Sequence, residues 1–285
     1  MKTLSSLKKD LDFNKNLSSL IEALKTIAVT QYKILEQRMR PFEKLLSSIE
    51  GFFQIIDTSI VGHPFLSPQN KTQMIVAVTS DTGLLGGLNM QVISQAVTEL
   101  GKMPGKLLVI GECGKTFLHD SSIPFVAFSG IKDEQRHAQA MQLRDYCIER
   151  VLKEKIGFLK VVYPRPVSFT VQRVEVLSFL PFSAPTTPQK AGFGLEPEVL
   201  LESKLEDVIE YLIYTWIGQK SYEIFGLSRL AEFAARFVHL EESHQKLKEL
   251  DGKTRLEYFR VRHELIDRNM RELFSARLLY AGQSG

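Results

Sequence analysis

Two glycine-rich turns are the places where this 285-residue chain could bind a phosphate group. The first, SDTGLLGGLN at 80–89, follows a strand-like run and precedes a helical one, the setting in which backbone N–H groups bind an anion. Its glycines at 83, 86 and 87 do not fit G-x-G-x-x-G, and no Lys-Ser or Lys-Thr pair follows. A tight turn between a strand and a helix is therefore the better interpretation.

The second turn, GECGKT at 111–116, ends in the Gly-Lys-Thr of a phosphate-binding loop. That loop needs four residues between its glycines, and here there are two, Glu112 and Cys113. Val109 stands where the first glycine belongs. The shorter loop lacks the N–H groups that surround the phosphates, so we do not expect nucleotide binding here.

No other residues have the spacing of a catalytic or metal site. His239 and His244 lie about 140° apart around a helix, and no acidic residue completes a ligand set. Neither G-x-S-x-G nor a Cys-His signature is present, and Glu241 and Glu242 diverge on a helix surface. We therefore expect no catalytic residue, no cofactor and no metal. The six histidines considered are His63, His119, His137, His239, His244 and His263.

Composition excludes several classes of protein. Hydrophobic residues make up 44% and charged residues 24%, as in ordinary globular chains. The net charge of +3 is too small for a protein that binds nucleic acid through its backbone. The apolar stretch 208–217 contains Glu210 and is about half a membrane span, so no membrane crossing is expected. The cysteines, Cys113 and Cys147, are interpreted as reduced thiols in a cytosolic compartment.

The first sixty residues have the pattern of a long helix that needs a partner. Large or small apolar residues recur every seven positions, which favours a coiled-coil seam over an ordinary amphipathic helix. Pro41 is expected to kink this helix without ending it. The predicted seam consists of Ile21, Ala28, Leu35, Phe42, Ile49 and Ile56.

The middle of the chain, about 72–180, alternates strand-like and helical segments. Helix formers fill 135–152, and the order of strands and helices predicts a small α/β domain with a mostly parallel sheet. The expected strands are 74–79, 107–110, 124–128, 158–163 and 169–180.

A second long helix is predicted after a proline- and glycine-rich linker at 181–197. The stretch 198–280 contains no proline and, if continuous, would be roughly 120 Å long. The fold class is therefore α/β, with an antiparallel coiled coil of long N- and C-terminal helices and an inserted Rossmann-like domain. The predicted divisions are 1–60 for the first helix, 72–180 for the α/β domain, 181–197 for the linker and 198–285 for the last helix.

Arginines and aromatic residues alternate along the end of this last helix. One interpretation is a solvated face whose arginines pair with neighbouring carboxylates. The other is a surface that binds an acidic protein partner, because arginine is favoured at interfaces. The arginines are Arg255, Arg260, Arg262, Arg268, Arg271 and Arg277.

Five segments, in order along the chain, resemble a known family: the gamma subunit of F-type ATP synthases, the central rotor stalk. The family's T-S-D-R-G-L-C-G-G-L-N box is similar to TSDTGLLGGLN at 79–89, with Thr82 in place of Arg and Leu85 in place of Cys. Its R-M…R-P-Y segment resembles RMRPF at 38–42.

The other three segments lie in the last third of the chain. The acidic-proline entry to the family's last helix resembles LEPEVLL at 195–201, and S-E…A-A-R-M-x-A-M resembles SRLAEFAARFVHL at 228–240. Y-N-K-A-R-Q-x-x-I-T-x-E is similar to YFRVRHELIDRNMRE at 258–272. In this last segment Tyr258, Arg262 and Ile266 match, while His263 and Asp267 replace Gln and Thr.

The resemblance implies a non-catalytic rotor subunit that couples ion-driven rotation of a membrane ring to ATP synthesis or hydrolysis. Its implied partners are alpha, beta and epsilon subunits and the membrane c-subunit ring, at the cytoplasmic face of the bacterial inner membrane. The basic Q-K-I-T-K-A-M run of the family is here KNLSSLIEAL at 15–24, which indicates a divergent member. The partner interface is predicted at Arg255, Arg260, Arg262, His263, Ile266, Asp267 and Met270.

Two alternatives stay open from the residues alone. One is an α/β ligand- or nucleotide-binding protein with helical arms, which would bind nucleotide tightly and saturably. The other is a coiled-coil scaffold unrelated to ATP synthesis, which would self-associate without ATPase subunits. Neither accounts for five family-like segments in the right order.

Overall fold

A computed structural model describes the backbone of residues 3–39, 48–53, 62–68, 70–119, 121–183 and 203–282, with side chains up to residue 275. The chain forms two compact units, 28–236 and a helical unit made of 1–27 with 237–285. Phe42 and Ile56 of the predicted seam, the kink at Pro41 and the linker from residue 184 onward lie outside the described residues.

The elements follow the predicted order of helix, α/β domain and helix. They are α1 Leu4–Met39, β1 Gln73–Val78, α3 Leu88–Leu100, β2 Gly105–Ile110, α4 Glu112–His119, β3 Phe125–Phe128, α5 Arg136–Glu154, β4 Phe158–Pro166, β5 Gln172–Leu180 and α6 Leu205–Gly282.

The unit 28–236 is built on one five-stranded sheet with strand order β3-β2-β1-β4-β5. The first four strands are parallel, and β5 pairs antiparallel with β4. The mostly parallel, Rossmann-like sheet expected from the sequence is therefore present. The order reverses at β1, because β2 and β3 lie on one side of it and β4 on the other, which is the point where such sheets bind ligands.

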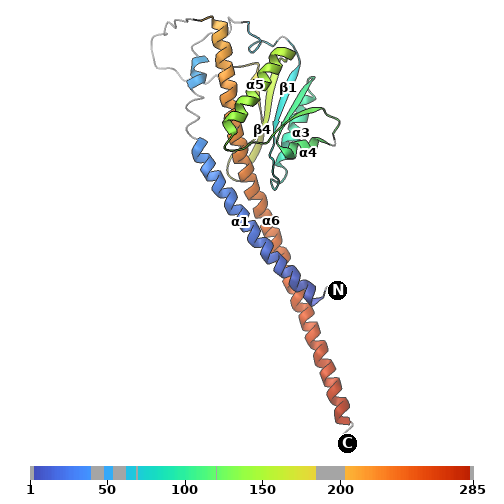
Figure 1. Cartoon of the computed structure of the whole chain (residues 1–285). Helices are drawn as coiled ribbons and strands as arrows, with labels where there is room; N and C mark the ends of the chain where they lie inside the picture. The colour runs from blue at the N-terminus through green and yellow to red at the C-terminus, as the bar shows by residue number, and fades with distance from the viewer. Residues whose placement is uncertain are drawn as a thin grey trace. The chain divides into compact units, whose positions relative to one another are not determined.

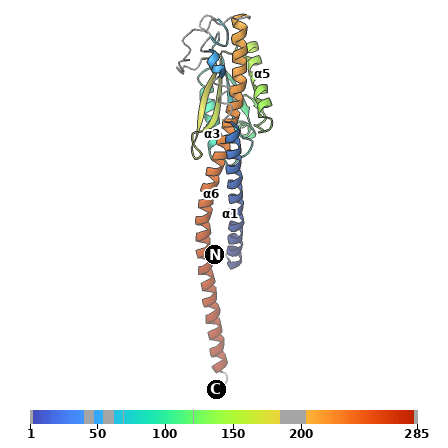
Figure 2. The same ribbon diagram turned by 90° about the vertical axis from the view of Figure 1, so that its left-hand side faces the viewer.

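Alternation along β1 divides the core into two layers. Met74, Val76 and Val78 face a large cluster that includes α5 and the first part of α6. Ile75 and Ala77 face a second cluster with α3 and α4. Figures 1 and 2 show α5 and the start of α6 side by side on the same face of the sheet. The sheet is thus covered on both faces, as parallel sheets require.

Two boundaries differ from the sequence-based expectation in a way that affects the architecture. The last helix begins at Leu205, and Ser203 and Lys204 before it are not helical, although helix was expected from residue 198. The last strand begins at Gln172, because Ser168 to Val171 form the turn of the β4–β5 hairpin through backbone hydrogen bonds. GECGKT forms the entry and first turns of α4.

Candidate functional site

The box at 79–89 ties together the carboxyl ends of the first two strands. The Thr79 hydroxyl donates a 2.6 Å hydrogen bond to the carbonyl of Ile110 and accepts one of 3.0 Å from the amide of Gly114. The Asp81 carboxylate accepts a 3.0 Å hydrogen bond from the amide of Glu112, the first residue of α4. Thr79 and Asp81 therefore fix β1 to the β2–α4 turn.

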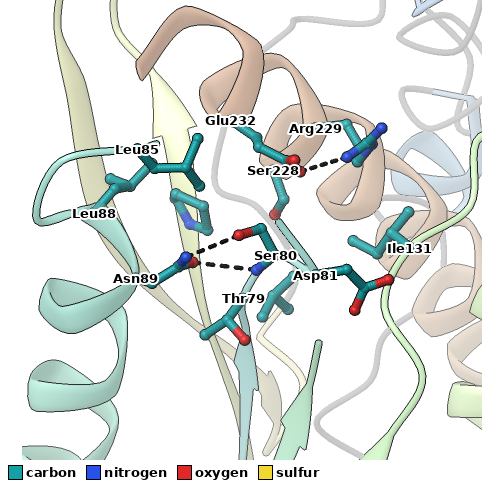
Figure 3. Close-up of a pocket in the computed structure, with 12 residues that line it drawn as sticks. Thr79, Ser80, Asp81, Leu85, Leu88, Asn89, Ile131, Ser228, Arg229 and Glu232 are labelled. Carbon is teal, nitrogen blue, oxygen red and sulfur yellow. Dashed lines mark hydrogen bonds and ion pairs between the residues drawn. The ribbon is translucent and has the colours of Figure 1, made fainter. Parts of the chain in front are cut away.

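Ser80 and Asn89 close the same turn on its other side. The Ser80 amide donates to Asn89 Oδ1 at 3.1 Å, and Asn89 Nδ2 donates to Ser80 Oγ at 2.8 Å. Ser80 Oγ in turn donates to the carbonyl of Thr82 at 2.8 Å. Figure 3 shows this pair facing the pocket at the end of β1. These polar groups have partners within the turn, which supports the interpretation of the box as a structural turn.

Helix α6 fills the crevice where a Rossmann-like sheet would take a ligand. Ser228, Arg229 and Glu232 of α6 line the pocket at the end of β1, together with Pro164 of β4 (Figure 3). The remaining cavity is about 10 Å³, room for roughly one water molecule. A nucleotide does not fit in this crevice while α6 is in place.

Charged side chains of α6 bind two loops at this edge of the sheet, in a cluster that we call the loop clasp: Thr82, Asp133, Arg229, Glu232 and Arg236. Glu232 accepts hydrogen bonds from Thr82 Oγ1 at 3.2 Å, Arg236 Nη2 at 2.7 Å and Arg229 Nη1 at 2.5 Å. Arg236 Nη2 also donates to Thr82 Oγ1 at 2.6 Å. Arg229 Nε donates to Asp133 Oδ1 and Arg229 Nη2 donates to Asp133 Oδ2, each at 3.2 Å.

The α6 side chains of the loop clasp are largely buried, whereas its loop residues Thr82 and Asp133 are exposed. The Glu232 side chain is 5% exposed, and those of Arg236 and Arg229 are 14% and 19% exposed. Burial by itself lowers the pKa of Arg229, but the carboxylates of Glu232 and Asp133 outweigh it and raise the pKa above its usual range. The two arginines and the two carboxylates of the clasp are opposite in charge and equal in number.

Neither thiol nor metal chemistry is set up in the described part of the chain. Cys147 is buried, and burial raises the pKa of its thiol to about 12, so it stays protonated. Cys113 and Cys147 are free thiols. Over the described ranges, no group of three or more His, Cys, Asp or Glu side chains could hold a metal ion. No described helix is long and apolar enough to cross a membrane.

Within the unit 28–236, the end of α1 packs along α6. Leu35 is 5% exposed and packs with Leu230 and Phe233, flanked by Tyr32 and Met39. Ala28 is 1% exposed. Ile49, in the helical segment 48–53, is buried in the large core cluster with Phe53. These three predicted seam residues are therefore buried.

In the helical unit, α1 and α6 run antiparallel. Ile21 packs with Leu240 and Leu247, and Ser18 Oγ lies 3.2 Å from His244 Nε2. Lys25, seven residues after Ser18 on α1, pairs with Glu241 of α6. The hydrogen bond from Lys25 lowers the pKa of the Glu241 carboxyl. The order of these contacts is reversed on the two helices, as an antiparallel pair requires.

Two seam positions escaped the sequence analysis. Leu7 and Asn14 continue the seven-residue spacing backwards from Ile21 and are 0% and 6% exposed. Asn14 lines a polar groove that lies between the two helices and has a volume of about 650 Å³. The signal was present in the spacing, but the polar Asn14 interrupted the apolar row.

The predicted partner interface lies on the exposed end of α6. All seven of its residues are exposed. Arg255 pairs with Asp251, whereas Arg260 and Arg262 form no ion pair with any described residue. Large apolar side chains are exposed beside them, with Ile266 and Met270 at 47% and 48%. Arg268, on the same part of α6, pairs with Glu272, so the partner interface at this end stays a prediction.

A second exposed apolar row runs along α1. Its members are also seven residues apart, next to the buried seam positions, and each is about half exposed or more. The row consists of Phe13, Leu20, Ile27 and Ile34. Exposed apolar rows of this kind mark surfaces that contact other proteins.

Comparison with known proteins agrees with these features. The sequence model of the ATP synthase family matches residues 3–277. The ATP synthase gamma chain of Clostridium pasteurianum is 22% identical over 277 residues, which cover 95% of this chain and 96% of the relative. That of Halothermothrix orenii is 25% identical over 281 residues, covering 96% and 97%.

Solved structures share the fold at low sequence identity. A chain of the Euglena gracilis mitochondrial ATP synthase in its OSCP/F1/c-ring structure aligns with a TM-score of 0.67 and 16% identity, over 99% of this chain and 96% of that one. A chain of the rotor structure from the same source aligns with a TM-score of 0.61 over 92% and 98%.

The chain therefore belongs to the ATP synthase family. Its relatives from Clostridium pasteurianum and Halothermothrix orenii are gamma chains, matched over almost their whole length, and the chain is of this non-catalytic type.

Proposed function

We propose that this chain is the central rotor stalk of an F-type ATP synthase. The observation that carries the proposal is the match to gamma chains over 95–96% of this chain and 96–97% of theirs. The chain would couple rotation of a membrane ring to ATP synthesis or hydrolysis at sites on other subunits. An asymmetric stalk does this without catalytic residues, because its different faces favour different conformations of the surrounding subunits.

The partners in this proposal are alpha, beta and epsilon subunits and the membrane c-subunit ring. Two surfaces support it: the exposed end of α6, with Arg260 and Arg262, and the exposed apolar row of α1. Each has the aromatic, aliphatic or arginine content typical of protein interfaces. The chain would act as a peripheral subunit at the cytoplasmic face of the bacterial inner membrane.

Co-expression with alpha and beta subunits tests this function. We expect a complex with one copy of this chain per three alpha–beta pairs, and an ATPase rate that depends on the chain. A chain that stays alone, or that pairs with itself, would contradict the proposal and favour the scaffold or ligand-binding alternatives.

A truncation separates assembly from rotation. A chain that ends after Arg262 lacks the last part of α6 but keeps α1 and the sheet domain. We expect it to assemble with alpha and beta subunits and to generate less torque than the full chain in a single-molecule rotation assay. Unchanged torque would show that the part of α6 beyond Arg262 does not contribute to torque.

A further inference from the structure

The loop clasp lies at the C-terminal end of the part of α6 that belongs to the unit 28–236. Arg236 is the final residue of the compact unit 28–236. Ahead of it, Ile213, Ile217 and Phe225 of α6 are part of the large core cluster. Along α6, the polar contacts of Glu232 and Arg236 with Thr82 therefore come after the apolar contacts that attach the helix to the sheet domain.

The clasp attaches α6 to two separate loops. Thr82 belongs to the loop between β1 and α3, whereas Asp133 belongs to the loop between β3 and α5. Arg229, Glu232 and Arg236 are spaced i, i+3 and i+7, so they lie on one face of the helix. A helix that is bonded to two loops from one face resists rotation about its own axis.

Mechanical load on such a helix is concentrated at this point. When torque passes along a rod into a body that holds it, the strain is largest where the rod enters the body. Apolar packing is non-directional and permits small rotations, whereas hydrogen bonds in which one partner is charged, such as those of Thr82 with Arg236 and Glu232, are directional and strong. The clasp supplies directional contacts at the place where the load enters.

We propose that Thr82, Glu232 and Arg236 are positioning residues that fix the angle of α6 relative to the sheet domain while torque passes between them. The proposal rests on the proposed function as a rotor stalk and adds the device that keeps the attachment stiff. Thr82 is central to it, because its hydroxyl accepts from Arg236 and donates to Glu232.

The test compares two substitutions at Thr82 in the assembled complex. Thr82→Val removes the hydroxyl and keeps the shape, whereas Thr82→Ser keeps the hydroxyl. With the alpha–beta ring fixed to a surface and a probe on the sheet domain, the angular variance of the probe is measured during the pauses of ATP-driven rotation. We expect a larger variance for Thr82→Val and the unaltered variance for Thr82→Ser.

Thr98→Val is the matched control. Its hydroxyl bonds the carbonyl of Ser94 within α3, away from α6. We expect this variant to keep the unaltered variance, even if its melting temperature falls. Arg236→Met provides a second removal of the clasp and is expected to raise the variance as Thr82→Val does.

The outcomes distinguish this proposal from the proposed function. If complexes of Thr82→Val and Arg236→Met assemble and rotate with unaltered angular variance, the clasp is only a stabilising contact and the proposal is wrong. A rise in variance that Thr82→Ser shares would also contradict it. If the unaltered chain does not assemble with the ring, the proposed function fails, and this proposal fails with it.

Discussion

Met39 of α1 and Gly226 of α6 approach so closely that a side chain at position 226 has no free space. A Cβ atom there would lie 2.5 Å from Sδ and 2.7 Å from Cε of Met39. At Gly252, also in α6, nothing lies within 4 Å of the corresponding Cβ position. The two glycines therefore separate the effect of helix propensity from the effect of packing.

Alanine substitutions at these glycines are expected to differ. Gly252→Ala should stabilise the local helix by about 1 kcal/mol, because glycine costs that much in a helix interior. Gly226→Ala should gain less, since Met39 must move, and Gly226→Leu should destabilise the pairing by about 1–3 kcal/mol through overpacking. Hydrogen exchange of the amides around each site measures both effects. Equal protection by the two alanines would show that the Met39 contact carries no strain.

The heptad spacing was the most informative part of the sequence for the fold. It predicted the burial of Ile21, Ala28 and Leu35, because a residue every seven positions keeps to one side of a helix. It did not predict the burial of Leu7, because the polar Asn14 interrupts the row of apolar residues. The strands were found from their apolar runs, and their ends lie within three residues of the expected ones. The largest differences are the end of β4, at Pro166 and not Tyr163, and the start of β5, at Gln172 and not Phe169.

The loop clasp could not be predicted from the sequence. Thr82 and Glu232 are 150 positions apart, and neither has a local signal that identifies the other. The glycine-rich box was correctly interpreted as a turn from its spacing. The spacing of the box could not show that α6 covers the crevice beside the box, because α6 comes from the end of the chain and packs there only in the folded protein.

Neighbouring residues on α1 give a direct test of the seam. Leu35 is 5% exposed against Leu230 and Phe233, whereas Ile34 beside it is 47% exposed. Leu35→Ala should lower the free energy of unfolding by about 2–5 kcal/mol, and Leu35→Asp by more, because a charge is then buried without a partner. We expect Ile34→Asp to change the stability of the isolated chain by less than about 0.5 kcal/mol.

Denaturant unfolding of the isolated chain checks these values, and co-expression with alpha and beta subunits adds the functional result. Leu35→Asp should abolish assembly. ATP-driven rotation by a complex that contains Leu35→Asp would contradict the packing of Leu35 in the seam.

Acid pH should weaken the sheet domain through Glu99. This carboxylate is 7% exposed and bonds Lys102 Nζ at 2.5 Å and Lys160 Nζ at 2.9 Å. The hydrogen bonds from Lys102 and then Lys160 lower the pKa of Glu99 below its usual value of 4.5. A lowered pKa means that Glu99 stabilises the fold above about pH 4.5 and that this contribution is lost as the pH falls through the pKa in the folded state.

Glu99→Gln is therefore expected to lower the free energy of unfolding near neutral pH, and the difference from the unaltered chain should shrink below about pH 4.5. Glu112→Gln is the control, because Glu112 pairs with Lys115 on an exposed surface and is itself 64% exposed. Its effect should be small at every pH. A constant difference between Glu99→Gln and the unaltered chain from pH 7 to pH 3 would contradict the role of Glu99.

The exposed end of α6 gives the last prediction, which decides between a partner interface and a solvated face. Arg260 and Arg262 form no ion pair with any described residue, so their substitution by glutamate should change the stability of the isolated chain by less than about 0.5 kcal/mol. In the complex the same change should weaken ring binding and ATPase activity, because guanidinium groups at interfaces bind carboxylates.

Salt and a control variant make the result specific. Binding of the unaltered chain should weaken as ionic strength rises, and binding of the Arg260→Glu, Arg262→Glu double variant should respond less, because screened charges contribute less. Lys153→Glu reverses a charge that is 71% exposed on α5, in the unit 28–236, and should leave ring binding unchanged. If the double variant binds the ring and supports ATPase activity as the unaltered chain does, these arginines are solvated and the predicted interface is wrong.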